Sequence, residues 1–249
     1  MISVCVATYN GEAFVEEQLA SILKQLSCHD EVVICDDGSK DKTLQIINNI
    51  NDHRIRLFLN EHNLGHVANF ERLITLARGD IIFLSDQDDI WVPGKVGMAM
   101  NFFTSRSDVL MYHHGYGLID INGQEIEGGT RWRTGLRFGI PFLFREFIKP
   151  TLFGSCLAFR KSVIDLLIPF PKVVYAHDHW ATIIGALAGG IFYDSNPLVR
   201  RRIHGSNLSP DRGLGVMFRL RVRILYLTMF FSAGFRLMYR KILSFFTFH

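Results

Sequence analysis

The first hundred residues alternate short apolar runs with segments that have the periodicity of amphipathic helices. Apolar, strand-like runs occupy residues 2–7, 32–35, 55–59 and 81–84. Helical patterns lie between them, at about residues 12–26, 41–51 and 67–77. Parallel strands need a long crossover between them, which is usually a helix. This alternation predicts an α/β fold with a Rossmann-like, mostly parallel sheet and helices on both faces.

The pattern changes after residue 92. Helices are expected from Pro93 to Phe103, at 161–167 and from near Asp178, and strands at 109–112 and 197–203. Five glycines interrupt the stretch 120–150, which we interpret as a loop-rich insertion that faces an acceptor. We therefore predict one domain over 1–211, with a nucleotide-binding half (1–105) and an acceptor-binding half (106–211), followed by a helical tail (212–249).

Composition narrows the class of protein. The chain has 249 residues, of which 48% are hydrophobic, so it can form a full core. Its four cysteines form no C-x-x-C pair, which favours reduced thiols over a disulfide scaffold or a zinc site. Met1 leads directly into an apolar run without a basic leader. We expect a cytoplasmic protein.

Basic residues are concentrated in the tail. Residues 212–249 hold seven Arg and Lys and no acidic residue, whereas the first 211 residues hold 20 basic and 24 acidic ones. This distribution argues against a nucleic-acid partner. The apolar run at 224–235 is too short to span a bilayer, but its mixture with arginines is typical of an amphipathic helix on an anionic membrane. The alternative is a helix that packs on the core or on a second copy in a homo-oligomer.

Polar clusters follow the four apolar runs. Since parallel strands end at one edge of a sheet, we expect these clusters to form one site. They are Thr8-Tyr9-Asn10-Gly11, Asp36-Asp37-Gly38-Ser39, Asn63-Leu64-Gly65 and Asp86-Gln87-Asp88-Asp89. Asp36 is a candidate acceptor for the N3 hydrogen of a pyrimidine base. The alternative is a turn that caps the next helix.

Three carboxylates within four residues, at 86–89, indicate a divalent cation, because such a density of anions after an apolar strand requires compensation. Oxygen ligands suit Mg²⁺ or Mn²⁺ that also binds a phosphorylated substrate. An acidic turn that caps a helix is the alternative.

Two histidine-containing segments complete the candidate site. In His177-Asp178-His179-Trp180, Asp178 is placed to act as a general base at a helix start, unless it is only an N-cap. His204 follows three arginines that could hold a diphosphate, and it is a candidate metal or phosphate ligand. A solvated basic loop is the alternative for this second segment.

Together, in this order, the motifs resemble those of the inverting family-two glycosyltransferases, which have the GT-A fold. The resemblance covers residues 2 to about 207 and is strongest up to Trp91, where Asp86-x-Asp88 matches the DXD motif. The sequences at 85–91 and 177–180 look most like those of bacterial rhamnosyltransferase-type members that build surface polysaccharides such as lipopolysaccharide. One departure is His177, because many members have a Glu before the Asp at this position.

The resemblance implies a role for each candidate residue. A UDP- or dTDP-linked sugar donor, such as dTDP-rhamnose, would be bound by Thr8, Tyr9, Asn10, Asp36, Asn63, Gly65 and Asp86. Asp88 and His204 would hold Mg²⁺ or Mn²⁺, and Asp178 would be the catalytic base. The acceptor, a glycan or lipid-linked sugar, and the phosphates would be bound by Gly154, Ser155, Trp180 and Arg202. The enzyme would then work at the inner face of the plasma membrane.

Two other functions stay open from the residues alone. A sugar nucleotidyltransferase would also use a metal and a nucleotide at such a sheet edge, although the chain has no Gly-rich loop that ends in Lys. A non-catalytic membrane or glycan-binding protein would use the acidic clusters only as caps.

Overall fold

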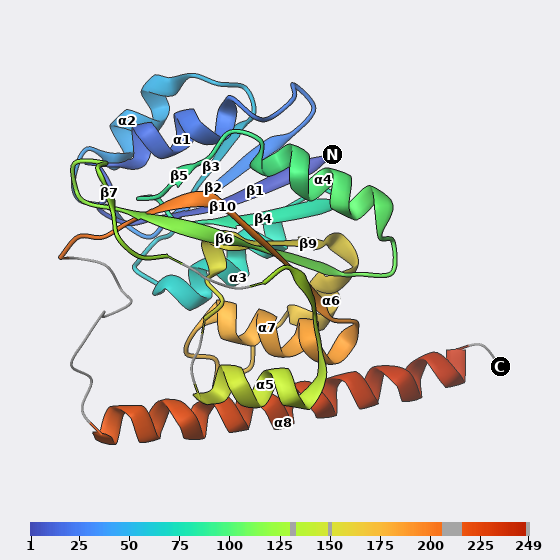
Figure 1. Ribbon diagram of the computed structural model, residues 1–249. Helices are drawn as coiled ribbons and strands as arrows, with labels where there is room; N and C mark the ends of the chain where they lie inside the picture. Colours follow the sequence, from blue (N-terminus) through green and yellow to red (C-terminus); the bar gives the residue numbers. More distant parts are fainter. Residues whose placement is uncertain (130–132, 149–150, 206–215, 248–249) are drawn as a thin grey trace.

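A computed structural model describes residues 1–129, 133–148, 151–205 and 216–247 (Figure 1). Its centre is one large sheet with the strand order β3-β2-β1-β4-β9-β6-β10-β5, to which β7 and β8 are added at β6 and β10. The strands are β1 (Ile2–Thr8), β2 (Glu31–Asp36), β3 (Ile55–Leu59), β4 (Ile81–Ser85), β5 (Ile90–Trp91), β6 (Met111–Ile119), β7 (Glu125–Ile126), β8 (Gly135–Arg137), β9 (Leu157–Arg160) and β10 (Ile191–Arg202).

The first half of the sheet is parallel. Strands β3, β2, β1 and β4 run in one direction and are joined by helical crossovers, as the alternating pattern predicts. The crossovers are α1 (Val15–Leu23), α2 (Thr43–Ile50) and α3 (His66–Leu76). Strands β1, β2 and β4 are buried along almost their whole length, which explains their continuous apolar runs.

The second half of the sheet is mixed. Strand β9 runs antiparallel to both of its neighbours, β4 and β6, while β10 is parallel to β6. The predicted α/β fold with a central sheet is confirmed, and the sheet continues unbroken past residue 105. The boundary predicted at residues 211–212 lies outside the described residues.

Helices cover both faces of the sheet (Figure 1). One apolar core lies between the sheet and helices α1 and α4 (Lys95–Ser105). The other lies beneath α3 and α7 (His177–Ala188) and includes buried side chains of α5 (Gly139–Ile148), α6 (Ile164–Leu167) and α8 (Val216–Thr247). Helix α7 lies between the sheet and the pair α5 and α8.

The predicted loop-rich insertion at 120–150 is partly wrong. This stretch contains β7, β8 and the ten-residue helix α5. Its glycines concealed the helix, which is stabilised by tertiary contacts: Phe142 and Leu143 are buried in the same core as α7. None of the helices in the described residues is both long and apolar enough to cross a membrane.

Candidate active site

The loops that follow β1, β2, β3 and β4 meet at the carboxyl edge of the parallel half of the sheet. Backbone pairing of Thr8 with Asp36 and of Asp36 with Leu59 brings three of these strand ends into register. The expected convergence of the polar clusters at one sheet edge is therefore observed. Open α/β sheets bind their ligands at such an edge.

Asp36 organises the loop after β2. Its carboxylate is almost fully buried and accepts hydrogen bonds from the hydroxyls of Thr8 (2.9 Å) and Ser39 (2.6 Å). It also accepts the backbone N–H groups of Gly38 (3.1 Å) and Ser39 (2.8 Å). Four donors match the four lone pairs of a carboxylate. Asp36 thus has the turn-fixing role that sequence analysis offered as the alternative, and base binding by Asp36 stays a prediction.

Asn10 ties the first two loops together. Its backbone N–H donates to the Ser39 hydroxyl (2.8 Å), and its side-chain oxygen accepts the N–H of Lys40 (2.8 Å). Asn10 has a φ of +48°, a left-handed conformation that asparagine adopts more readily than most residues. Its neighbour Tyr9 is 47% exposed, so its ring is available to a ligand.

Gln87 is a site residue that sequence analysis missed. Its amide bonds both backbone groups of Tyr9: the Tyr9 N–H donates to Gln87 Oε1 (2.8 Å), and Gln87 Nε2 donates to the Tyr9 carbonyl (2.9 Å). A Cβ at Gly11 would overlap this amide, which explains the glycine. The clamp joins the ends of β1 and β4, and no local pattern in the sequence pairs residues 78 positions apart.

Asn63 and Gly65 form the start of α3. The Gly65 N–H donates to Asp37 Oδ2 (2.9 Å) and to Asn63 Oδ1 (3.0 Å), and Gly65 has a φ of +80°. Asp37 also accepts the N–H of Leu64 (2.7 Å). Asp37 is therefore structural, and it positions the loop that carries Asn63.

Asp88 and His204 come together across 116 residues of sequence. His204 Nε2 lies 2.8 Å from Asp88 Oδ2, and the side chains are only 8% and 16% exposed. The ring of His204 also packs on Phe14, with centroids 4.9 Å apart. The two predicted metal ligands are thus neighbours.

The carboxylates at 86–89 repel one another. Burial, followed by the charges of Asp89 and Asp88, raises the pKa of Asp86 well above its usual range. Burial and Asp88 also raise the pKa of Asp89 to about 6, and the described residues donate no hydrogen bond to its buried Oδ2. Because a bound cation would relieve this repulsion, the cluster fits a divalent metal.

The protein by itself supplies only part of a coordination shell. Within the described residues, no group of three His, Cys, Asp or Glu side chains is arranged to hold a metal ion. One carboxylate and one imidazole are nevertheless suited to Mg²⁺ or Mn²⁺ when phosphate oxygens and water supply the other ligands.

The guanidinium of Arg202, which was predicted to bind the acceptor or the phosphates, is engaged by protein groups. Its guanidinium is 3% exposed and donates to the Glu17 carboxylate (2.6 Å) and to the carbonyls of Asp88 (3.1 Å) and Ile121 (3.0 Å). It therefore braces the loop that carries Asp88. The neighbouring Arg201 is better placed, because its charge acts on both Asp86 and Asp89, and its guanidinium stacks on Phe153 at 4.6 Å.

Asp178 lies in the first turn of α7 and faces the acidic cluster. Its charge contributes to the raised pKa of Asp86, which places the two carboxylates near each other although 92 positions separate them. Burial alone would raise the pKa of Asp178, but the rings of His179 and His177 and the His179 N–H (2.7 Å) outweigh it, so the pKa is lowered. Asp178 is thus ionised at neutral pH, as a base must be.

Histidines surround this base. His66, at the start of α3, lies 5.6 Å from the ring of His177, and its electrostatic interaction with Asp178 shows that the two are close. His66 directly follows the Asn63-Leu64-Gly65 motif, but a histidine in the first turn of a helix carries no signal by itself. His177 stacks on Phe70 at 3.8 Å and has no hydrogen-bond partner among the described residues.

The remaining predicted acceptor residues are in the core. Trp180 is fully buried, and its indole N–H donates to the Leu167 carbonyl (2.9 Å), so its predicted contact with the acceptor is wrong. Gly154 is buried against His177, whose ring a Cβ would overlap. Ser155 is 2% exposed, and its carbonyl accepts a hydrogen bond from the buried Lys95 amine (2.8 Å). These residues pack the floor beneath the site.

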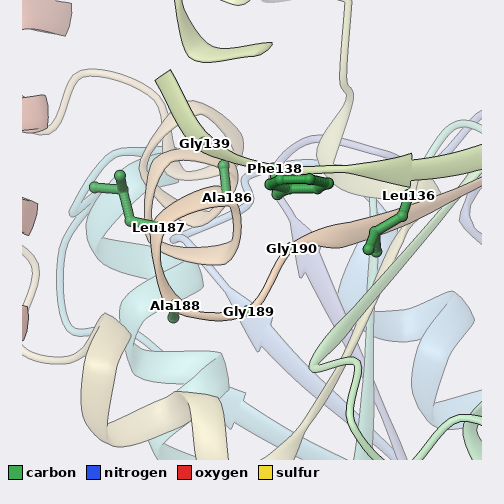
Figure 2. A pocket seen from close by; sticks show the side chains of 8 residues that line it. All are labelled: Leu136, Phe138, Gly139, Ala186, Leu187, Ala188, Gly189 and Gly190. Atoms are coloured by element: carbon green, nitrogen blue, oxygen red, sulfur yellow. The ribbon is translucent and has the colours of Figure 1, made fainter. Parts of the chain in front are cut away.

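A separate hollow of about 440 Å³ lies between the end of α7 and the segment from β8 to α5 (Figure 2). Its lining is entirely apolar or glycine: Leu136, Phe138, Gly139, Ala186, Leu187, Ala188, Gly189 and Gly190. Because it contains no charged side chain, it does not resemble a diphosphate site.

Residues 3–167 match the family described as glycosyl transferase family 2. This match covers well over half of the chain, so the chain belongs to that family and is a transferase.

Relatives agree with this class. An uncharacterized glycosyltransferase of Haemophilus influenzae is 33% identical over 129 residues, which are 51% of this chain and 51% of the relative. The Escherichia coli protein WfgD, named as a UDP-Glc:alpha-D-GlcNAc-diphosphoundecaprenol beta-1,3-glucosyltransferase, is 30% identical over 122 residues, 49% of this chain and 48% of that one. The matched region thus spans about half the length of these relatives.

Solved structures confirm the fold. The structure of Staphylococcus aureus TarS in complex with UDP-GlcNAc aligns with a TM-score of 0.68 and 21% identity, over 90% of this chain and 66% of that one. The complex of TarS with UDP aligns with a TM-score of 0.65 and 23% identity, over 81% and 60%. At this identity the likeness shows a GT-A fold and nothing finer.

Proposed function

We propose that this chain is a metal-dependent, inverting glycosyltransferase that moves a sugar from a nucleoside-diphosphate donor to a hydroxyl of a lipid-linked or growing bacterial glycan. The observation that carries the proposal is the pairing of Asp88 with His204 beside Asp86, with an ionised Asp178 facing the same cluster. In this arrangement the proposed general base would adjoin the proposed diphosphate site.

Each residue has a defined task in this reaction. Asp178 accepts the proton of the acceptor hydroxyl while that oxygen forms a bond to the anomeric carbon. On the opposite face the bond from this carbon to the diphosphate breaks, and the nucleoside diphosphate leaves with the electron pair. Arg201 is placed to hold phosphate oxygens. The metal held by Asp88 and His204 would stabilise the negative charge of the leaving group.

The donor is proposed to carry UDP. TarS was solved with UDP and UDP-GlcNAc, and the E. coli relative is named for UDP-Glc. In this chain, Tyr9 and Asn10 would contact the base, and hydrogen bonds through Ser39 connect Asn10 to Asp36. A dTDP-linked donor such as dTDP-rhamnose is the alternative.

The free thiols of all four cysteines are compatible with the proposed cytoplasmic location.

Calorimetric titration with UDP and with dTDP, each with and without Mn²⁺, tests the proposal. We expect UDP to bind the parent only with Mn²⁺, and the variant Asp88→Asn to lose this binding. Transfer should fall on the order of a hundredfold. The matched control is Asp80→Asn, which removes an exposed carboxylate just before the other end of β4, where it pairs with the amino terminus at 2.9 Å.

Metal-independent binding that Asp88→Asn leaves intact would remove the metal from the proposal. Absence of binding to either nucleotide in the parent would refute the donor assignment. Tighter binding of dTDP than of UDP would establish the alternative donor.

A further inference from the structure

Helix α8 presents a continuous apolar face to solvent. Six of its large apolar side chains are between 46% and 69% exposed: Leu220, Ile224, Leu227, Phe231, Phe235 and Met238. Their spacings of three and four residues place them on one side of the helix. Isolated apolar residues are normal on a protein surface, whereas a contiguous stripe of this length marks an interaction surface.

The neighbouring helix α5 also exposes large apolar side chains. Ile140, Phe144 and Ile148 are 56–65% exposed and are spaced by four residues. Helix α5 packs against α8 through Phe147, whose ring centroid lies 5.7 Å from that of Tyr226, and the Tyr226 hydroxyl donates to the Leu143 carbonyl (3.3 Å). Both helices lie on the side of the molecule away from the exposed face of α1 and α2 (Figure 1).

The rotation of α8 about its own axis is fixed. Tyr226, Met229 and Ala233 are buried on the side opposite the stripe. Arg236 donates to the carbonyls of Leu166 (3.0 Å) and Leu167 (2.8 Å), and Arg223 donates to the carbonyl of Ile148. These contacts keep the apolar stripe turned outward.

The charge around this surface is of one sign. Helix α8 contains six Arg and Lys and no Asp or Glu, and Arg221 is exposed beside the stripe. A two-fold contact between two copies of α8 would bring the same basic patch against itself, without acidic residues on α8 to compensate. An anionic lipid surface supplies both the apolar depth and the opposite charge.

We infer that α5 and α8 together form one surface that lies in the headgroup region of an anionic bilayer. The inference deepens the proposed function and depends on it only for the acceptor. Helix α7, which begins with the base Asp178, packs on the same two helices: the ring of His179 lies 6.0 Å from that of Tyr226. A lipid-linked acceptor would therefore approach the base from the membrane side.

The test is sedimentation of the full chain with vesicles of phosphatidylcholine, with and without phosphatidylglycerol, in the absence of donor and acceptor. Two double variants are compared with the parent: Phe231→Glu with Phe235→Glu in α8, and Ile140→Glu with Phe144→Glu in α5. The matched control is Leu59→Glu, at a 55% exposed position on β3. Circular dichroism and thermal unfolding establish that each variant is folded.

The parent should bind vesicles that contain phosphatidylglycerol. Each double variant should lose about tenfold or more in partition coefficient, because it replaces two apolar side chains that would enter the bilayer with charged ones. Leu59→Glu should match the parent. Arg221→Gln should weaken binding to the anionic vesicles alone.

Full binding by the folded α5 variant would overturn the inference that α5 belongs to the surface. If the parent does not bind anionic vesicles, the inference as a whole is overturned. If that parent is a dimer that the α8 variant converts to a monomer, the occupant of the surface is a second copy. Because the vesicles contain no acceptor, these outcomes are independent of transferase activity.

Discussion

At the scale of single residues, the surroundings of two nearby carboxylates shift their pKa values in opposite directions. Asp178 lies in the first turn of a helix, where the positive end of the helix dipole and the hydrogen bond from the His179 N–H favour its ionised form. Asp86, nearby, is under the opposite influence, because burial and neighbouring carboxylates favour its protonated form. The proposed base and the proposed cation ligands thus differ in their surroundings.

Asp178→Asn should separate binding from chemistry. The amide keeps the shape of the side chain but cannot accept a proton, so transfer should fall by about two orders of magnitude or more. The affinity for UDP with Mn²⁺, measured by calorimetry, should stay within about threefold of the parent because Asp178 belongs to the acceptor side. Transfer at the parental rate would show that another group is the base.

At the scale of elements, helix α8 packs on the core through a few buried side chains, while its opposite face is exposed. Met229 and Ala233 are completely buried in the core that also contains Trp180 and Tyr226. The helix therefore belongs to the folded domain, and sequence analysis offered this packing as the alternative to membrane association. The two are compatible, since opposite faces of one helix serve them.

Two methionines of α8 provide a matched pair. Met229→Ala removes a fully buried side chain and should lower the free energy of unfolding by about 2–3 kcal/mol. Met238→Ala changes a 54% exposed side chain and should have an effect within about 0.5 kcal/mol. Denaturant unfolding measures both values, and amide exchange along α8 should accelerate only in Met229→Ala. Equal effects would contradict the docking of α8 through this face.

At the scale of the whole molecule, several histidines are buried in the neutral form. Burial lowers the pKa of His113 to about 3 and that of His177 to about 4, and it lowers the pKa of His114 as well. His113 Nε2 accepts the N–H of Phe153 (3.1 Å), which fits an unprotonated ring. Because the unfolded chain binds these protons near pH 6.5, their stabilising effect is complete above that pH and is lost as the pH falls toward 3–4.

The free energy of unfolding should therefore decrease between pH 7 and pH 5, by about 2 kcal/mol for each buried histidine. Denaturant unfolding at a series of pH values measures this difference. His113→Gln retains an acceptor for the Phe153 N–H but cannot be protonated, so the difference between pH 7 and pH 5 should shrink by about 2 kcal/mol. If the variant lowers stability equally at both pH values, His113 is not a source of the pH dependence.

The sequence alone determined the parallel half of the sheet and the convergence of its polar loops. Apolar periodicity is a local property, and the carboxyl ends of parallel strands share one edge of a sheet, so the sequence assigned Thr8, Asn63 and Asp88 to that edge. The resemblance likewise assigned the role of base to Asp178, which stays a prediction. Helix α5 escaped notice because its stability comes from packing on α7 and α8, and glycines obscured its periodicity.

Only the tertiary structure decided which member of each cluster faces the site. Arg201 and Arg202 are adjacent in a strand and point to opposite faces. The guanidinium of Arg202 is buried and pairs with Glu17, so it has a structural role. Gln87 and His66 acquired their roles from partners 78 and more than 100 positions away. The periodicity of strands and helices depends on residues that are close in sequence. The burial and the direction of a side chain depend instead on residues from elsewhere in the chain that pack against it.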